Sequence, residues 1–184
     1  MAINKEKNRY EKYLILLILL SLYLSLAESL IPKPVPWLKI GLANIGGIIA
    51  LEKFGKRMAV EVVILRILIQ GLMLGTLFTP GFIISFISGI SSLFIMISLY
   101  HFRDKLSLIS ISTVSALTHN IVQLLVVYFL LFRNININSK YIIFFVFGFL
   151  ILGCISGMIT GIIGERLSLR RNIKAWENIS EQME

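Results

Sequence analysis

The feature of this 184-residue chain that most constrains its fold is a succession of apolar blocks, most of them about twenty residues long. At about 1.5 Å per residue, a helical block of this length crosses a hydrocarbon layer of roughly 30 Å. A soluble core of this size would not need several such blocks in succession. Only 15% of the residues are charged and 57% are hydrophobic, so the blocks dominate the sequence. The pattern therefore predicts an all-α, polytopic membrane protein.

We expect six transmembrane helices. The first runs from Tyr13 to Ile31 and stops at the proline-rich segment 32–36, because alternating prolines cannot continue a helix. A cleaved signal peptide is the alternative for this segment, but the apolar stretch is long for a signal and the polar loop follows late. The later full-length spans are expected at about 58–78, 82–102, 106–132 and 141–164. The chain then divides into a basic tail (1–12), a membrane domain (13–164) and a C-terminal tail (165–184).

The second apolar block, Leu38 to Leu51, is unusually short. Its fourteen residues would give a helix of about 21 Å, less than a full membrane crossing. Such a helix must begin in the interface, sit against protein, or be broken near Gly46 and Gly47. Transporters use short, glycine-interrupted spans to build binding sites at mid-membrane, so we expect a short, Gly-interrupted second helix.

The basic residues are distributed asymmetrically along the chain. Thirteen of the eighteen Lys and Arg lie in the two tails and in the loops around 53–57 and 103–105, which share one side if the helices alternate. The positive-inside rule places that side, and both termini, in the cytoplasm of a bacterial inner membrane. Topology therefore explains the net charge of +8, with anionic lipids as partners of the basic tails and no role for nucleic acid.

Small residues recur at a spacing of four on three of the expected helices. Such stripes allow close approach of helix backbones in lipid. We expect the glycines to make contacts within the bundle, whereas the serines could instead face a second protein. The stripes are Ser21, Ser25 and Ser29; Gly71 and Gly75; and Gly153, Gly157 and Gly161.

Several polar side chains fall inside the expected spans, where ionisable groups cost at least a few kcal/mol and normally face a cavity or a partner. Three or four helices contribute such groups to the outer half of the bundle, which predicts a polar pocket that opens outward. The alternative is an internal hydrogen-bond network, for example between Arg66 and either Glu28 or Glu61. The expected substrate-binding residues are Glu28, Lys39, Asn44, Arg66, Gln70, His119, Asn120 and Gln123.

The sequence argues against several chemistries. There is no phosphate-binding loop of the Walker type, so ATP hydrolysis would require another chain. Asp104 is the only aspartate, which excludes the carboxylate clusters that hold magnesium in enzymes that condense prenyl diphosphates. Cys154 is the only cysteine and is read as an inert buried thiol. We therefore expect no catalytic residues, no metal and no cofactor in this chain.

Four motifs in order carry a family resemblance across about Tyr13 to Gly164: ESLIP, LKIGLANIGG, ILRILIQGLMLGTLF and ALTHNIVQLL. The chain resembles a bacterial membrane family known both as Gx transporter and as heptaprenyl diphosphate synthase component I. That family looks like the substrate-binding subunits of energy-coupling-factor vitamin transporters, which associate with a transmembrane coupling protein and two ATPases. Many such subunits dock through an alanine stripe, where this first helix has serines. The resemblance implies a role for Glu28, Lys39, Gly41, Asn44, Arg66, His119, Asn120 and Gln123.

Two functions remain open at this point. The first is a membrane subunit that binds a small, anionic metabolite, such as a vitamin or an isoprenoid or quinone precursor. The second is a membrane accessory subunit of heptaprenyl diphosphate synthesis that anchors a soluble catalytic chain. A purified catalytic partner would separate them, because only an accessory subunit should change prenyl chain length or turnover.

Overall fold

The structure is a computed structural model that describes residues 2–30, 42, 44–131 and 140–181. The described residues form helices and turns and contain no strand, as the all-α prediction requires. The proline-rich loop, Lys39 and the loop 133–139 lie outside the described residues. The helices are α1 (Ala2–Ser29), α2 (Asn44–Phe54), α3 (Lys56–Met73), α4 (Pro80–Tyr100), α5 (Leu108–Leu131) and α6 (Lys140–Glu181).

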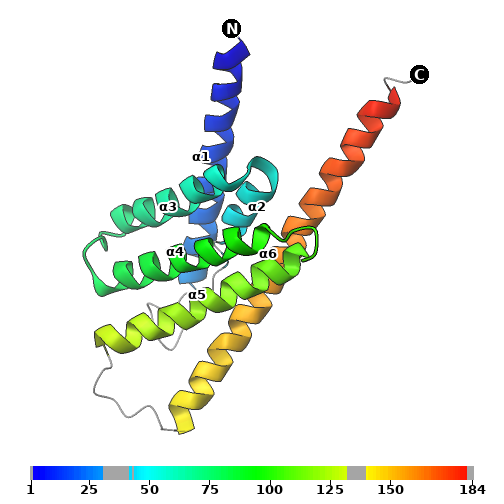
Figure 1. Cartoon of the computed structure of the whole chain (residues 1–184). Helices are drawn as coiled ribbons and strands as arrows, with labels where there is room; N and C mark the ends of the chain where they lie inside the picture. The colour runs from blue at the N-terminus through cyan, green and yellow to red at the C-terminus, as the bar shows by residue number, and fades with distance from the viewer. Residues whose placement is uncertain (1, 31–41, 43, 132–139, 182–184) are drawn as a thin grey trace.

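Three of the helices, α3, α4 and α5, form a layer in which consecutive helices are antiparallel and packed side by side (Figure 1). The remaining long helices pack against the two outer members of this layer: α1 contacts α3, and α6 contacts α5. The short α2 contacts α1, α3 and α6, so it lies at the junction of the bundle. The N-terminal end of α1 and the C-terminal end of α6 both point to the top of the view in Figure 1.

Four of the helices have the length and composition of membrane spans: Tyr10–Glu28, Pro80–Tyr100, Leu108–Leu130 and Lys140–Leu167. The other two differ for different reasons. With eleven residues α2 is too short, whereas α3 carries Lys56, Arg57, Glu61 and Arg66 within eighteen residues. The protein is thus all-helical with four candidate spans among the described residues, and the larger count of six and the orientation stay predictions.

The short α2 is continuous, so the expected interruption near Gly46 and Gly47 is wrong. All residues from Ile45 to Leu51 are buried, which means that the helix sits against protein. The two glycines let it approach its neighbours: a Cβ on Gly46 would overlap Ser21 of α1, and a Cβ on Gly47 would lie 2.9 Å from Val63 of α3. The missing side chains serve close packing rather than a break in the helix.

The expected third span also ends earlier than predicted, at Met73 rather than near 78. Gly75 has a φ of 64° and terminates α3 in a Schellman motif, in which the Thr76 N–H donates to the Gly71 carbonyl at 2.8 Å. Gly75 is therefore a turn residue and not a packing position. Gly71 does pack within the bundle, since a Cβ there would lie 2.8 Å from the ring of Phe82 in α4.

The glycine stripe of α6 lies against α5, which confirms the expected contact within the bundle. A Cβ on Gly157 would lie 2.6 Å from the Thr113 Cα, and a Cβ on Gly161 would overlap the backbone at Ile109. On α1, Ser21 and Ser25 are also buried inside this chain, so these two serines do not face a second protein. The sequence did not distinguish packing within the chain from contact with a second protein, because serine suits both.

The terminal helices extend beyond the expected spans. The structure begins α1 at Ala2 and continues α6 to Glu181, well past Gly164. Neither extension contains a glycine or proline, so nothing local ends the helix. Figure 1 shows the last turns of α6 projecting away from the other helices.

Candidate functional site

The most unusual buried group in the structure is the guanidinium of Arg66 on α3. Arg66 is 5% exposed and interacts electrostatically with Glu28 of α1, which is 1% exposed. Glu61 is engaged elsewhere: its carboxylate accepts from the Tyr10 hydroxyl at 2.8 Å and pairs with Arg57 at 3.1 Å. Of the two carboxylates that the sequence offered to Arg66, the structure therefore places Glu28 beside it.

The pairing leaves part of the guanidinium available. The Nε atom of Arg66 is buried and has no hydrogen-bond partner among the described residues. One turn later on the same helix, Gln70 is also buried at 5% exposure. Buried polar atoms are nearly always hydrogen-bonded in native proteins, so this Nε lacks, within the described part of the chain, the acceptor that such an atom normally has.

A second group of expected site residues lies on α5. His119 and Gln123 are one helical turn apart and both are buried. The helix α4 packs against both α3, which carries Arg66, and α5, which carries His119 and Gln123 (Figure 1). A single outward-opening pocket that joins these side chains stays a prediction.

Asn120 is directed toward α6. Its side-chain amide donates to the Phe149 carbonyl at 3.0 Å, and Gly153 provides the space, since a Cβ there would overlap the amide. The Oδ1 atom of Asn120 is buried without a hydrogen-bond partner among the described residues. Asn120 therefore fixes α5 to α6 and retains one acceptor.

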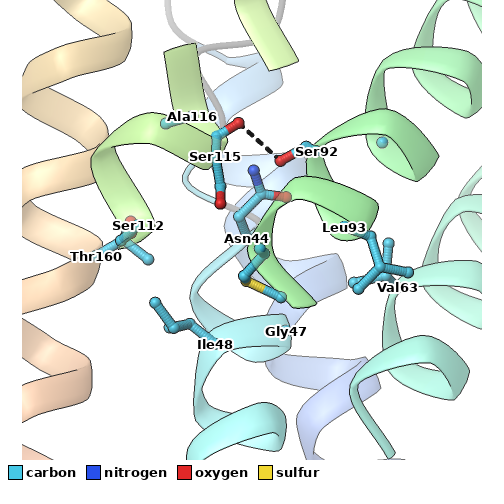
Figure 2. Close-up of a pocket in the computed structure, with 12 residues that line it drawn as sticks. Asn44, Gly47, Ile48, Val63, Ser92, Leu93, Ser112, Ser115, Ala116 and Thr160 are labelled. Carbon is cyan, nitrogen blue, oxygen red and sulfur yellow. Dashed lines mark hydrogen bonds between the residues drawn. The ribbon is translucent and has the colours of Figure 1, made fainter. Parts of the chain in front are cut away.

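Asn44 is the expected site residue that lines the cavity in Figure 2. This cavity lies where α2 to α6 meet and measures about 10 Å³, which is room for about one water molecule. The Asn44 side chain extends toward α4 and α5, and its Nδ2 atom is buried without a partner among the described residues. The remaining polar lining residues are Ser92, Ser112, Ser115 and Thr160.

The hydroxyl groups around this cavity were missed by the sequence analysis. The hydroxyl of Ser92 donates to the Ser115 carbonyl at 2.9 Å and so joins α4 to α5, as Figure 2 shows. Ser115 and Thr160 donate to carbonyls one turn back in their own helices, both at 2.8 Å. A spacing of three to four residues between Ser85, Ser88 and Ser92 was the signal that could have revealed this polar face.

The arrangement suits recognition of a polar molecule rather than covalent chemistry. Its groups are a charged pair, amides and hydroxyls, supplied by α1 to α6. Among the described residues there is no group of three or more His, Cys, Asp or Glu that could hold a metal ion. Lys39, the remaining expected site residue, lies outside the described residues, so its place in the site is untested.

Comparison with known proteins identifies the family of this chain. Neither curated proteins nor solved structures give a significant match to the chain. A protein family described as heptaprenyl diphosphate synthase component I matches residues 17–167, from the first turns of the apolar part of α1 to the end of the apolar part of α6. This match covers most of the chain and includes every expected site residue. The chain therefore belongs to the heptaprenyl diphosphate synthase component I family.

Proposed function

We propose that this protein is a membrane subunit that binds a small, anionic metabolite, such as a vitamin or an isoprenoid or quinone precursor. The observation that carries the proposal is the buried guanidinium of Arg66, whose Nε has no hydrogen-bond partner among the described residues. A guanidinium in a low-dielectric bundle favours an anionic acceptor, and its planar fork suits a carboxylate or a phosphate.

Two other expected site residues support a binding role. Asn44 and Asn120 each retain a buried polar atom without a partner among the described residues, one a donor and the other an acceptor. These atoms come from α2 and α5, and Arg66 comes from α3. Polar groups from several helices that are left incompletely satisfied are what a specific small-molecule site requires, because the ligand supplies the missing bonds.

Transport would require partners that this chain does not supply. The sequence contains no nucleotide-binding loop, so an energised cycle needs the transmembrane coupling protein and two ATPases of the energy-coupling-factor arrangement that the sequence resembles. We place the protein in the bacterial inner membrane, with substrate entering from outside. The charge distribution of the loops supports that orientation.

The test is mass spectrometry of small molecules that co-purify with the detergent-extracted full chain. We expect an anionic metabolite to accompany the wild-type protein and to be lost from Arg66→Gln. The matched control is Arg57→Gln, which makes the same chemical change on the same helix at a side chain that is 89% exposed. If no metabolite is enriched, or if both variants lose it equally, Arg66 does not bind the ligand.

The family description favours a second function, a membrane accessory subunit of heptaprenyl diphosphate synthesis. The absence of aspartate clusters excludes the prenyl transfer itself from this chain, so a soluble catalytic subunit would perform it. The C-terminal part of α6, beyond the apolar part that ends at Leu167, offers a helix for such a partner to bind. Addition of the purified membrane subunit to the catalytic subunit should then change product chain length or turnover. A transport subunit should leave both unchanged.

A further inference from the structure

Two turns meet at the end of the bundle that the charge distribution predicts to be cytoplasmic. The turn between α2 and α3 contains the single non-helical residue Gly55, and the turn between α4 and α5 follows Tyr100. The Tyr100 hydroxyl donates to Glu52 at 3.1 Å, and Arg103 lies 3.6 Å from the same carboxylate. These contacts hold the two turns against each other and define one continuous surface.

We call this surface the two-turn surface. Its exposed members combine basic and aromatic side chains from both turns: Lys53, Phe54, Lys56, Arg57, His101, Phe102 and Lys105. Asp104 is the exposed acidic residue among them. The two other carboxylates in this region are already engaged, Glu52 with Tyr100 and Arg103, and Glu61 with Tyr10 and Arg57. The two-turn surface therefore presents more basic side chains than unpaired carboxylates.

The contact between Lys56 and His101 lies at the centre of the two-turn surface. The Lys56 Nζ is 3.2 Å from the His101 Nδ1, so the ammonium donates to an imidazole nitrogen. An ammonium has three donors and only one is used in this contact. A phosphate oxygen placed beside the pair would accept from the remaining donors and would be favoured by the surrounding positive charge.

The aromatic members of the surface indicate where it lies relative to the bilayer. Phe102 is 56% exposed and Phe54 is 37% exposed, although both adjoin basic residues. Long basic side chains beside exposed aromatic rings are typical of the level where lipid head groups meet the hydrocarbon layer. A soluble acidic protein would satisfy the charges but would gain nothing specific from rings at this level.

We propose that the two-turn surface binds the head group of an acidic phospholipid, with the phosphate beside Lys56 and His101 and the acyl chains against Phe54 and Phe102. Such binding would hold the α2–α3 turn at a fixed depth in the membrane. The proposed lipid site lies at the start of α3, whereas Gln70 lies near the end of that helix. The lipid proposal therefore does not depend on the proposed metabolite.

The test measures binding of dioleoyl phosphatidylglycerol and dioleoyl phosphatidylcholine to the delipidated full chain by native mass spectrometry. We expect the wild-type protein to prefer phosphatidylglycerol. Lys56→Gln should weaken that binding about fivefold, the effect of one basic residue near an anionic surface. Lys140→Gln is the control, because it removes the same charge from an exposed position at the start of α6. Along α6, Lys140 is about 37 Å from Glu165. The Glu165 carboxylate accepts from the N–H of Leu108, the first residue of α5 after the α4–α5 turn, so Lys140 lies far from the two-turn surface.

Circular dichroism should show that both variants remain folded, since both side chains are exposed. Equal affinities for the two lipids would overturn the proposal. So would an equal loss of phosphatidylglycerol binding in Lys56→Gln and Lys140→Gln, because total charge rather than this surface would then control binding. Neither outcome would affect the metabolite proposal, which is tested at Arg66.

Discussion

Replacement of Gly157 by alanine should destabilise the contact between α5 and α6. The added Cβ would lie 2.6 Å from the Thr113 Cα and 3.1 Å from the Ser112 carbonyl oxygen, whereas ordinary contacts begin near 3.4 Å. Both neighbours are backbone atoms, so a rotamer change cannot relieve the clash and the helices must separate by about 0.8 Å at this point. Overpacking of this kind costs about 1–3 kcal/mol, against a gain of up to about 1 kcal/mol from alanine's higher helix propensity.

The same helix offers a matched control in Gly148, where a new Cβ would meet nothing within 4 Å. Gly148→Ala should keep or raise the melting temperature, because only the propensity term applies. For a chain of this size about 1 kcal/mol corresponds to about 2–4 °C, so Gly157→Ala should melt several degrees below Gly148→Ala. Thermal unfolding in detergent, followed by circular dichroism, measures the difference. Equal melting temperatures for the two variants would show that α5 and α6 are not packed through Gly157.

Two further predictions concern the charged pair and the topology. Arg66→Gln alone should lower stability if Arg66 is a structural partner of Glu28, and Glu28→Gln in the same chain should then restore much of the loss. Strong coupling between the stability effects of the two substitutions, with unchanged metabolite retention, would remove Arg66 from the site. In a Cys154→Ala background, a membrane-impermeant thiol reagent applied to intact cells should not label a cysteine placed at Asn8 or Ser180. Labelling at either position would contradict cytoplasmic termini.

The sequence predicts the helices well because apolar block length and turn residues are local signals. Pro80 begins α4 as its first residue, with Thr79 as N-cap, two residues before the expected start of that span at 82. The expectation that the glycine stripe of α6 makes contacts within the bundle is also confirmed, although the sequence did not say with which helix. The role of Gly75 was not predictable from spacing alone, because a glycine one turn after Gly71 fits either a packing stripe or a left-handed helix end, and φ decides between them.

The candidate site was harder to predict because it depends on which helices are neighbours. The sequence offered Glu28 and Glu61 equally to Arg66, and only the packing of α1 on α3, with Glu61 held by Tyr10, separates them. The hydroxyls of Ser92 and Ser115 gave no ionisable signal, yet they join two helices beside Asn44. Search by charge alone therefore finds the buried pair and misses the neutral polar junction.

The location of the Glu28–Arg66 pair bears on why this bundle contains it. A buried ion pair contributes little net stability, since desolvation of both groups offsets most of their attraction and apolar residues of similar volume often stabilise as well. The bundle has ample apolar side chains, and α1 already packs on its neighbours through Leu17, Ile18 and Leu22. Cohesion between α1 and α3 therefore does not require charge. We therefore propose that the guanidinium, whose buried Nε has no hydrogen-bond partner among the described residues, is retained to recognise an anionic group, which an apolar contact could not do.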